Sequence, residues 1–271
     1  MLIDLSNFVA RATAVRANYL ELLLQMLVKL RRQHPHHRFV FALEGSGTLR
    51  RQQLLRQYKA GRIPSPEFNE ARRTAITMLR NIPCGFIKAP DGEADDAIAS
   101  YCQQHSEDEI VIVSNDRDLW QLITPNVLIH TTVQRSTTDV DRHACRRLLG
   151  VDPEVVPLMK AMLGDPSDNI PRAIARVQQK KLLRVAQQAQ QPDGIEDAVA
   201  SADYLTENDK KKILSAISVV KTHMSVTRAW NNLNLKQRTH PGDAVALQEF
   251  LDPYGIKLST DEIDSIMGAI R

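Results

Sequence analysis

The sequence contains the stretch Asp91-Gly92-Glu93-Ala94-Asp95-Asp96-Ala97-Ile98-Ala99. Four carboxylates fall within six residues there, at the expected start of a helix. Side chains three and four positions apart share a helix face, so Glu93 and Asp96 point the same way with Asp95 beside them. Two interpretations of this acidic stretch are open. Acidic residues cap helix N-termini, but so much like charge in one place also suits a bound metal ion.

Length and composition indicate a globular protein. The chain has 271 residues, of which 43% are hydrophobic, and a formal net charge of only +3. A nucleic-acid partner would therefore be met by a local basic patch rather than by a global field. The three cysteines show no metal-ligand spacing, which suits a reducing cytoplasm. No apolar run approaches the roughly 20 residues of a membrane span, and no signal-peptide pattern precedes the first strand, so we expect a cytoplasmic protein without membrane contact.

Acidic residues also follow three expected strands. These strands cover residues 1–5, 39–43 and 110–114, and the acids at their ends are Asp4, Glu44, Asp116 and Asp118. Ligands of open parallel sheets bind beyond the carboxyl ends of the strands, so these acids would collect at one edge. Each acid alone could be a helix cap. Their gathering beside the acidic stretch favours a metal site.

The order of the expected elements indicates an α/β protein. A helix is expected from Arg11 to Leu30, and a fourth strand covers residues 127–130. Alternation of strands and helices predicts a mostly parallel sheet flanked by helices. Between the first helix and the second strand lies His34-Pro35-His36-His37. We interpret it as a solvated loop rather than a metal site, because Pro35 interrupts the spacing and no acid or cysteine is adjacent.

The segment 48–80 is strongly basic. Between Arg50 and Arg80 there are eight basic residues and two acids. Tyr58 and Phe68 lie among them and could stack on bases. The alternative is a solvated amphipathic helix, which would normally balance its charges with acids one turn away. We therefore favour binding of phosphate.

A second acidic segment, Leu163–Pro171, carries Asp165 and Asp168. It can start a helix or form a compact acid-bearing turn. Basic residues then recur every fourth position, and they would form one stripe if residues 172–188 are helical. These residues are Arg172, Arg176, Lys180 and Arg184. The stripe could follow a duplex backbone.

Five segments, in this order, resemble the flap-endonuclease-like 5′ nucleases. They are Leu2-Ile3-Asp4, Tyr58-Lys59-Ala60-Gly61-Arg62, Gly92-Glu93-Ala94-Asp95-Asp96, Asn115-Asp116-Arg117-Asp118 and Gly164–Pro171. The family includes stand-alone bacterial and phage 5′-3′ exonucleases and the 5′-nuclease domain of bacterial DNA polymerase I. The resemblance implies a PIN-like catalytic domain over residues 1–160, with a helical arch at 48–80. It also implies a helical duplex-binding module of divergent helix-hairpin-helix type, with a C-terminal extension, over residues 161–271.

The resemblance also implies a two-metal hydrolysis of phosphodiesters. Oxygen ligands suit two Mg²⁺ ions, for which Mn²⁺ can substitute. The implied ligands are Asp4, Glu44, Glu93, Asp95, Asp96, Asp116, Asp118, Asp165 and Asp168. Lys59 and Arg62 would neutralise the scissile phosphate, and Tyr58 would stack on the displaced end. Arg50 or Arg51 would hold phosphate at the base of the arch.

Two departures from the family pattern stand out. Glu44 occupies a position where the family usually has Asp. No glycine lies between Gly164 and Gly194, where the family has a glycine-rich hairpin that docks duplex phosphate and often a K⁺ ion. We therefore do not expect potassium dependence, and we expect the basic stripe from Arg172 to Arg184 to hold the duplex.

The sequence thus predicts a metal-dependent 5′-3′ exonuclease that also cuts flapped DNA. Two alternatives stay open: removal of RNA primers from RNA–DNA hybrids, and a non-catalytic DNA-binding homologue. Expected partners are DNA with 5′ ends, flaps or branches, and replication proteins, in a bacterium or a phage-infected cell.

Overall fold

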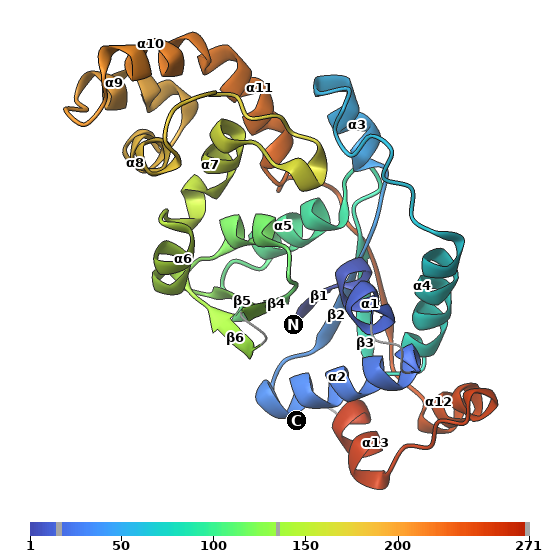
Figure 1. Ribbon diagram of the computed structural model, residues 1–271. Coiled ribbons are helices and arrows are strands. Elements are labelled where there is room, and N and C mark those ends of the chain that lie inside the picture. Colours follow the sequence, from blue (N-terminus) through green and yellow to red (C-terminus); the bar gives the residue numbers. More distant parts are fainter. Residues whose placement is uncertain (15–17, 134–135, 269–271) are drawn as a thin grey trace.

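One sheet forms the centre of the molecule. The computed structural model describes residues 1–14, 18–133 and 136–268. Within them, seven strands form a sheet in the order β6-β5-β4-β1-β2-β3-β7 (Figure 1). The strands are β1 (Leu2–Asp4), β2 (Phe39–Leu43), β3 (Cys84–Lys88), β4 (Ile110–Val113), β5 (Val127–Val133), β6 (Ser136–Val140) and β7 (Lys236–His240). The five inner strands β5, β4, β1, β2 and β3 are parallel to one another, and the two edge strands β6 and β7 are antiparallel to their neighbours. The expected mostly parallel sheet is confirmed.

Helices cover both faces of the sheet, because its strands are apolar on both sides. Leu2 belongs to one buried apolar cluster and its neighbour Ile3 to the other. The face of Ile3 is covered by α1 (Leu5–Thr13), α2 (Tyr19–Gln33), α4 (Pro66–Leu79), α12 (Ala244–Leu251) and α13 (Thr260–Met267). The opposite face is covered by α5 (Ala94–Gln104) (Figure 1).

The helix expected from Arg11 to Leu30 is in fact two. The first ends at Thr13, and Asn18 caps the second by accepting a hydrogen bond from the Leu20 amide at 3.3 Å. Residues 15–17, within the expected helix, lie outside the described residues. The capping asparagine at residue 18 was the sequence signal for this second start.

A helical module, defined here as residues 156–227, continues the apolar cluster of α5. It contains α7 (Val156–Leu163), α8 (Gln179–Ala189), α9 (Ile195–Ala200), α10 (Glu207–Ser215) and α11 (Ile217–Thr227). The helix α6 (Arg142–Leu149) links it to the sheet, and Gly150 ends α6 in the left-handed conformation. Short 3-10 helices complete the described chain: Arg117–Leu122, Pro153–Val155, Pro166–Asp168, Pro192–Gly194 and Asp252–Tyr254.

One expectation for the C-terminal part needs correction. Residues 172–178 are not helical, and α8 begins only at Gln179, so the expected stripe does not lie on one helix. After the helical module, the chain returns to the sheet. Its strand β7 pairs with β3, and α12 and α13 pack on the sheet side of the molecule. Within the described residues, no helix has both the length and the apolar character needed to cross a membrane.

The basic segment forms two helices with an irregular connection. The helix α3 (Gly47–Leu54) follows β2 directly, and α4 begins at Pro66 after Ser65, whose hydroxyl accepts the Phe68 amide at 3.2 Å. The connection between them, residues 55–65, carries Tyr58, Lys59 and Arg62. This connection brings the basic side chains to the edge of the sheet where the parallel strands have their carboxyl ends.

Candidate active site

Four acids meet at the carboxyl edge of the parallel strands. Asp4 ends β1, Glu44 follows β2, Asp116 follows β4, and Asp95 lies in the first turn of α5. Asp4 is 6% exposed. It accepts the Asn7 amide and the Ser114 hydroxyl, each at 3.1 Å. The convergence follows from the topology, since parallel strands end at one edge.

The electrostatics of this group shows how closely the acids face one another. Burial, with the neighbouring charges of Glu44 and Asp116, raises the pKa of Asp4 to about 7. Burial, followed by the charges of Asp116 and Asp4, also raises the pKa of Asp95 well above its usual value. Carboxylates that repel one another in this way are relieved by a divalent cation, and oxygen donors fit a hard ion such as Mg²⁺.

Glu44 lies against the start of α5. Its Oε2 accepts the Ala94 amide at 3.1 Å. This amide is one of the free N–H groups of the helix N-terminus, which favours a negative partner. The longer side chain of Glu44 thus reaches the acidic stretch across the sheet edge.

Glu93 contacts the connection between α3 and α4. Its Oε2 accepts the Tyr58 hydroxyl at 2.8 Å and the Lys59 ammonium at 3.0 Å, and the Thr48 hydroxyl donates to Oε1. Although burial opposes the effect, the charges of Lys59 and Arg51 lower the pKa of Glu93. Tyr58 is only 3% exposed, so it has no free ring face for a base. The expected stacking role of Tyr58 is not supported.

Lys59 and Arg62 reach a second acid as well. The Lys59 ammonium is 3.9 Å from Asp168 Oδ2, and Arg62 Nη1 is 3.1 Å from Asp168 Oδ1. The side chain of Arg62 is 63% exposed, whereas that of Lys59 is 19% exposed. Two cations therefore border the acids, and one of them is open to solvent.

Asp96 and Arg51 form a buried pair rather than parts of a metal or phosphate site. The guanidinium of Arg51 binds both Asp96 oxygens at 2.7 Å. The same oxygens accept the Glu93 and Trp230 amides, each at 2.8 Å. Asp96 is fully buried and Arg51 is 3% exposed. With four hydrogen bonds on its two oxygens, Asp96 ties the acidic stretch to the basic segment, which corrects its expected role as a ligand and that of Arg51 as a phosphate contact.

A separate acidic group holds an internal cation. Oxygens of Asp118, Asp165 and Asp168 lie within 4.8 Å of one another. The ammonium of Lys160, on α7, pairs with Asp118 and is 2.6 Å from Asp165 Oδ2. Burial opposes the effect, but the hydrogen bonds from Lys160 and Ser167 lower the pKa of Asp165. The donor set suits a divalent ion, although Lys160 must turn aside to admit one.

Sequence reasoning missed Lys160, Thr48 and Trp230. Lys160 precedes Asp165 by five residues on a helix that ends at Leu163, and this proximity in sequence was a usable signal. The main-chain contact of Trp230 with Asp96 had no signal, because it comes from residues far apart in sequence.

The expected duplex contacts are only partly available. Arg172 is turned back on its own chain, with Nε 2.8 Å from the Ile174 carbonyl and Nη2 2.6 Å from the Val177 carbonyl. Arg176, Lys180 and Arg184 are exposed, and Arg184 lies 3.7 Å from the centre of the Tyr204 ring. Arg50 is also exposed and stacks on Trp230 at 4.4 Å.

Comparison with known families places the first half of the chain. Residues 4–150 match the family model described as "5'-3' exonuclease, N-terminal resolvase-like domain". The DNA polymerase I of Bacillus caldotenax is 29% identical over 191 residues, which are 68% of this chain and 21% of that protein. The 5′-3′ exonuclease of Aquifex aeolicus is 28% identical over 153 residues, 55% of this chain and 52% of that protein. The chain thus spans about a fifth of the polymerase and about half of the stand-alone relative.

Comparison with solved structures covers nearly the whole chain. The T5 D15 protein, co-crystallised with metal ions, superposes with a TM-score of 0.71 over 98% of this chain and 96% of that one, at 16% identity. Human GEN1, in complex with Holliday junction DNA, superposes with a TM-score of 0.67 over 98% of this chain and 70% of that one, at 17% identity. At such identities the likeness shows the fold, and the PIN-like architecture expected from the sequence is confirmed.

Proposed function

The chain belongs to the 5′-3′ exonuclease family, and from that premise we propose that it is a metal-dependent 5′ nuclease acting on DNA. It hydrolyses phosphodiesters from 5′ ends and cuts flapped or branched structures. One observation carries the proposal: Asp4, Glu44, Asp95 and Asp116 converge at the sheet edge while a basic connection reaches the same place.

Two groups of acids would hold two divalent ions. Asp4, Glu44, Asp95 and Asp116 form the first group, and Glu93 borders it. Asp118, Asp165 and Asp168 form the second. When bound, Mg²⁺ or Mn²⁺ supplies a water of lowered pKa and neutralises charge on the leaving oxygen. The raised pKa of Asp4 and Asp95 supports the first group, because a bound cation would offset both the burial of these carboxylates and the repulsion between them that raise it.

The cations Lys59 and Arg62 bind the scissile phosphate. The exposed guanidinium of Arg62 can turn from Asp168 to a phosphate, because the Lys59 ammonium stays 3.9 Å from Asp168. Lys59, held on Glu93 at 3.0 Å, stays in place and stabilises charge as it builds on the phosphate. The acids thus bind the metal ions, and Lys59 and Arg62 bind the phosphate.

The duplex is held by the second half of the chain. We assign the catalytic domain to residues 1–160, with the arch at 48–80, and duplex binding to the helical module, which also contributes Asp165 and Asp168 to the second acidic group. Arg176, Lys180 and Arg184 are exposed, as are Lys211 and Lys221, whereas Arg172 is engaged with its own backbone. Arg50 provides a further exposed contact at the base of the arch.

The proposal is tested on a 5′-labelled flap substrate in Mg²⁺. We expect Asp95→Asn to lower the cleavage rate by at least about 100-fold while DNA affinity in Ca²⁺ is kept. Asp264→Asn, an exposed acid on α13, is the matched control and should cleave at the parental rate. Undiminished cleavage by Asp95→Asn would remove the catalytic assignment. The same assay on an RNA–DNA hybrid measures whether the enzyme prefers primer RNA.

A further inference from the structure

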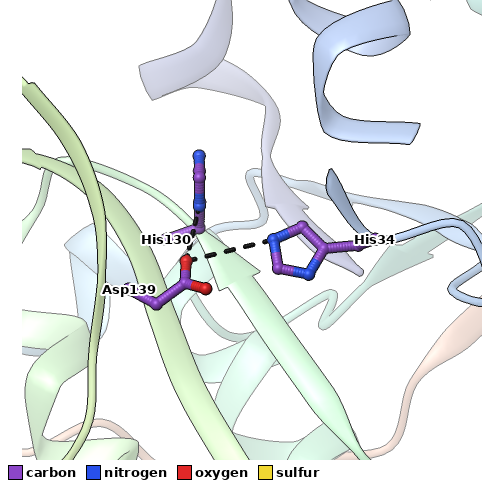
Figure 2. Close-up of side chains that lie close together, drawn as sticks. All are labelled: His34, His130 and Asp139. Atoms are coloured by element: carbon purple, nitrogen blue, oxygen red, sulfur yellow. Dashed lines mark hydrogen bonds and ion pairs between the residues drawn. The ribbon is translucent and has the colours of Figure 1, made fainter. Parts of the chain in front are cut away.

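Two histidines and an aspartate gather away from the acidic groups. His34 follows α2, His130 lies within β5, and Asp139 lies on β6 directly opposite His130 in the strand register. Figure 2 shows the three side chains pointing toward one another. None of them takes part in the candidate active site. The expectation that His34 belongs to a solvated loop without an acid partner is wrong, because the fold buries its side chain and brings Asp139 to it.

The spacing of their ligand atoms is close to that of a metal site. His130 Nδ1 is 2.6 Å from Asp139 Oδ1, and His34 Nε2 is 3.9 Å from the same oxygen. One ligand atom from each residue lies within 4.8 Å of the others. Ligands at about 2.0–2.1 Å from a tetrahedral ion are roughly 3.3 Å apart, so small side-chain rotations would complete the geometry.

One ring nitrogen of the three residues is buried without a hydrogen bond. His34 Nε2 is buried and has no hydrogen bond to any residue in the described ranges. The side chains of His34 and His130 are 12% and 6% exposed. A buried polar atom without a hydrogen bond costs about 1–3 kcal/mol. The hydrogen bond between His130 and Asp139 does not explain why His34 Nε2 is buried in this way. A metal ion would satisfy it.

The protonation state and access also fit. Burial lowers the pKa of His34, and the neighbouring His130 adds to this while Asp139 opposes it. His34 therefore offers a lone pair at neutral pH. The side chain of Asp139 is 44% exposed, which leaves room for an ion to enter and for a water as fourth ligand.

We propose that His34, His130 and Asp139 bind one divalent transition-metal ion, with Zn²⁺ preferred. Two imidazoles and one carboxylate suit zinc, whereas Mg²⁺ prefers oxygen ligands alone. The ion ties the end of α2 to the β5–β6 pair, which already meets α2 where Lys29 Nζ lies 3.2 Å from Thr137 Oγ1. Its role is structural: it joins a helix on one sheet face to the edge strand.

The test is a titration of metal-free protein with Co²⁺ and Zn²⁺ in excess Mg²⁺, which keeps the carboxylate groups occupied. We expect one equivalent of Co²⁺ to give the visible bands of a low-coordinate site, Zn²⁺ to displace it, and Zn²⁺ to raise the unfolding temperature. His34→Gln should weaken binding by at least about 10-fold. His36→Gln, an exposed neighbour in the same loop, is the matched control and should bind like the parent.

Two further variants make the result decisive. Asp139→Asn, at a half-exposed position, tests the site if His34→Gln does not fold. Asp95→Asn should keep the zinc equivalent, because it belongs to the acidic group at the strand ends. Absence of saturable one-equivalent binding by the parent, or parental affinity in both His34→Gln and Asp139→Asn, would overturn the proposal.

Discussion

Replacing Asp4 by Asn should stabilise the metal-free protein above neutral pH. The pKa of Asp4 is raised from 3.8 to about 7, chiefly by burial and then by Glu44 and Asp116. The ionised carboxylate is therefore unfavourable in the folded state. The amide oxygen of Asn can still accept the Asn7 amide that Asp4 accepts at 3.1 Å, so the local structure is kept.

The magnitude follows from the size of the shift. Because the folded-state pKa lies above the unfolded value, the folded protein holds its proton longer, and stability falls as pH rises from about 4 to about 7. A rise from 3.8 to about 7 corresponds to about 4 kcal/mol at 1.4 kcal/mol per unit. Since the titrations of Asp4 and Asp95 are linked, we expect the replacement of Asp4 alone to raise the free energy of unfolding by about 2 kcal/mol.

The assay is urea unfolding in EDTA between pH 4 and pH 8.5. Asp4→Asn should be more stable than the parent at pH 8, the difference should vanish near pH 4, and Mg²⁺ should stabilise the parent more than the variant. The control is Asp141→Asn, the same change at an exposed helix cap, where Asp141 accepts the Ala144 amide at 2.7 Å. The reasoning is refuted if Asp4→Asn is less stable at pH 8, or if the difference does not change with pH.

Three other substitutions test the surroundings of the site. Arg51→Met should lower the free energy of unfolding in urea by about 3–5 kcal/mol, because it leaves the buried Asp96 carboxylate without its cation. The control Arg50→Met should stay within about 0.5 kcal/mol of the parent, and equal effects of the two changes would contradict the buried pair. Lys160→Met should lower the unfolding temperature in EDTA. It should also raise the affinity for Mg²⁺ about 10-fold, since the Lys160 ammonium no longer competes with the metal ion for Asp165. An unchanged Mg²⁺ affinity in calorimetry would argue against that competition. Gly45→Ala should cost about 2 kcal/mol of unfolding free energy, because its Cβ would clash with the main-chain oxygen of Ala89. Parental stability, measured by circular dichroism, would contradict this close approach.

The strands β1, β2, β4 and β5 could be predicted because their local apolar pattern suffices, whereas β3 (Cys84–Lys88), although it lies inside the sheet, escaped prediction. The strand 39–43 was predicted with its observed bounds, and 110–114 was predicted one residue too long. The edges β6 and β7 escaped prediction. Their burial is low, as expected for edge strands, so they carry no apolar run to mark them, and β7 depends on pairing with a strand about 150 residues away.

The acids of the site could be located by sequence, but not their partners. Asp4 and Glu44 follow apolar strands, which fixes their place at the sheet edge. The pairing of Asp96 with Arg51 is invisible to sequence, because it depends on how closely α3 approaches α5 and on the amide of Trp230. The expected stripe failed for a local reason: Arg176 takes a positive φ of 57°, which no continuous helix allows.

The strand β7 changes how the helical module can move. The chain leaves the sheet after β6, builds the module and returns to the opposite edge of the sheet, and on its way back the Leu233 amide donates to Ser100 Oγ at 3.1 Å. The module is therefore a loop anchored at both ends rather than a tail. Two anchors restrict the module more than a single tether would, and the apolar cluster that it shares with α5 holds it against the sheet.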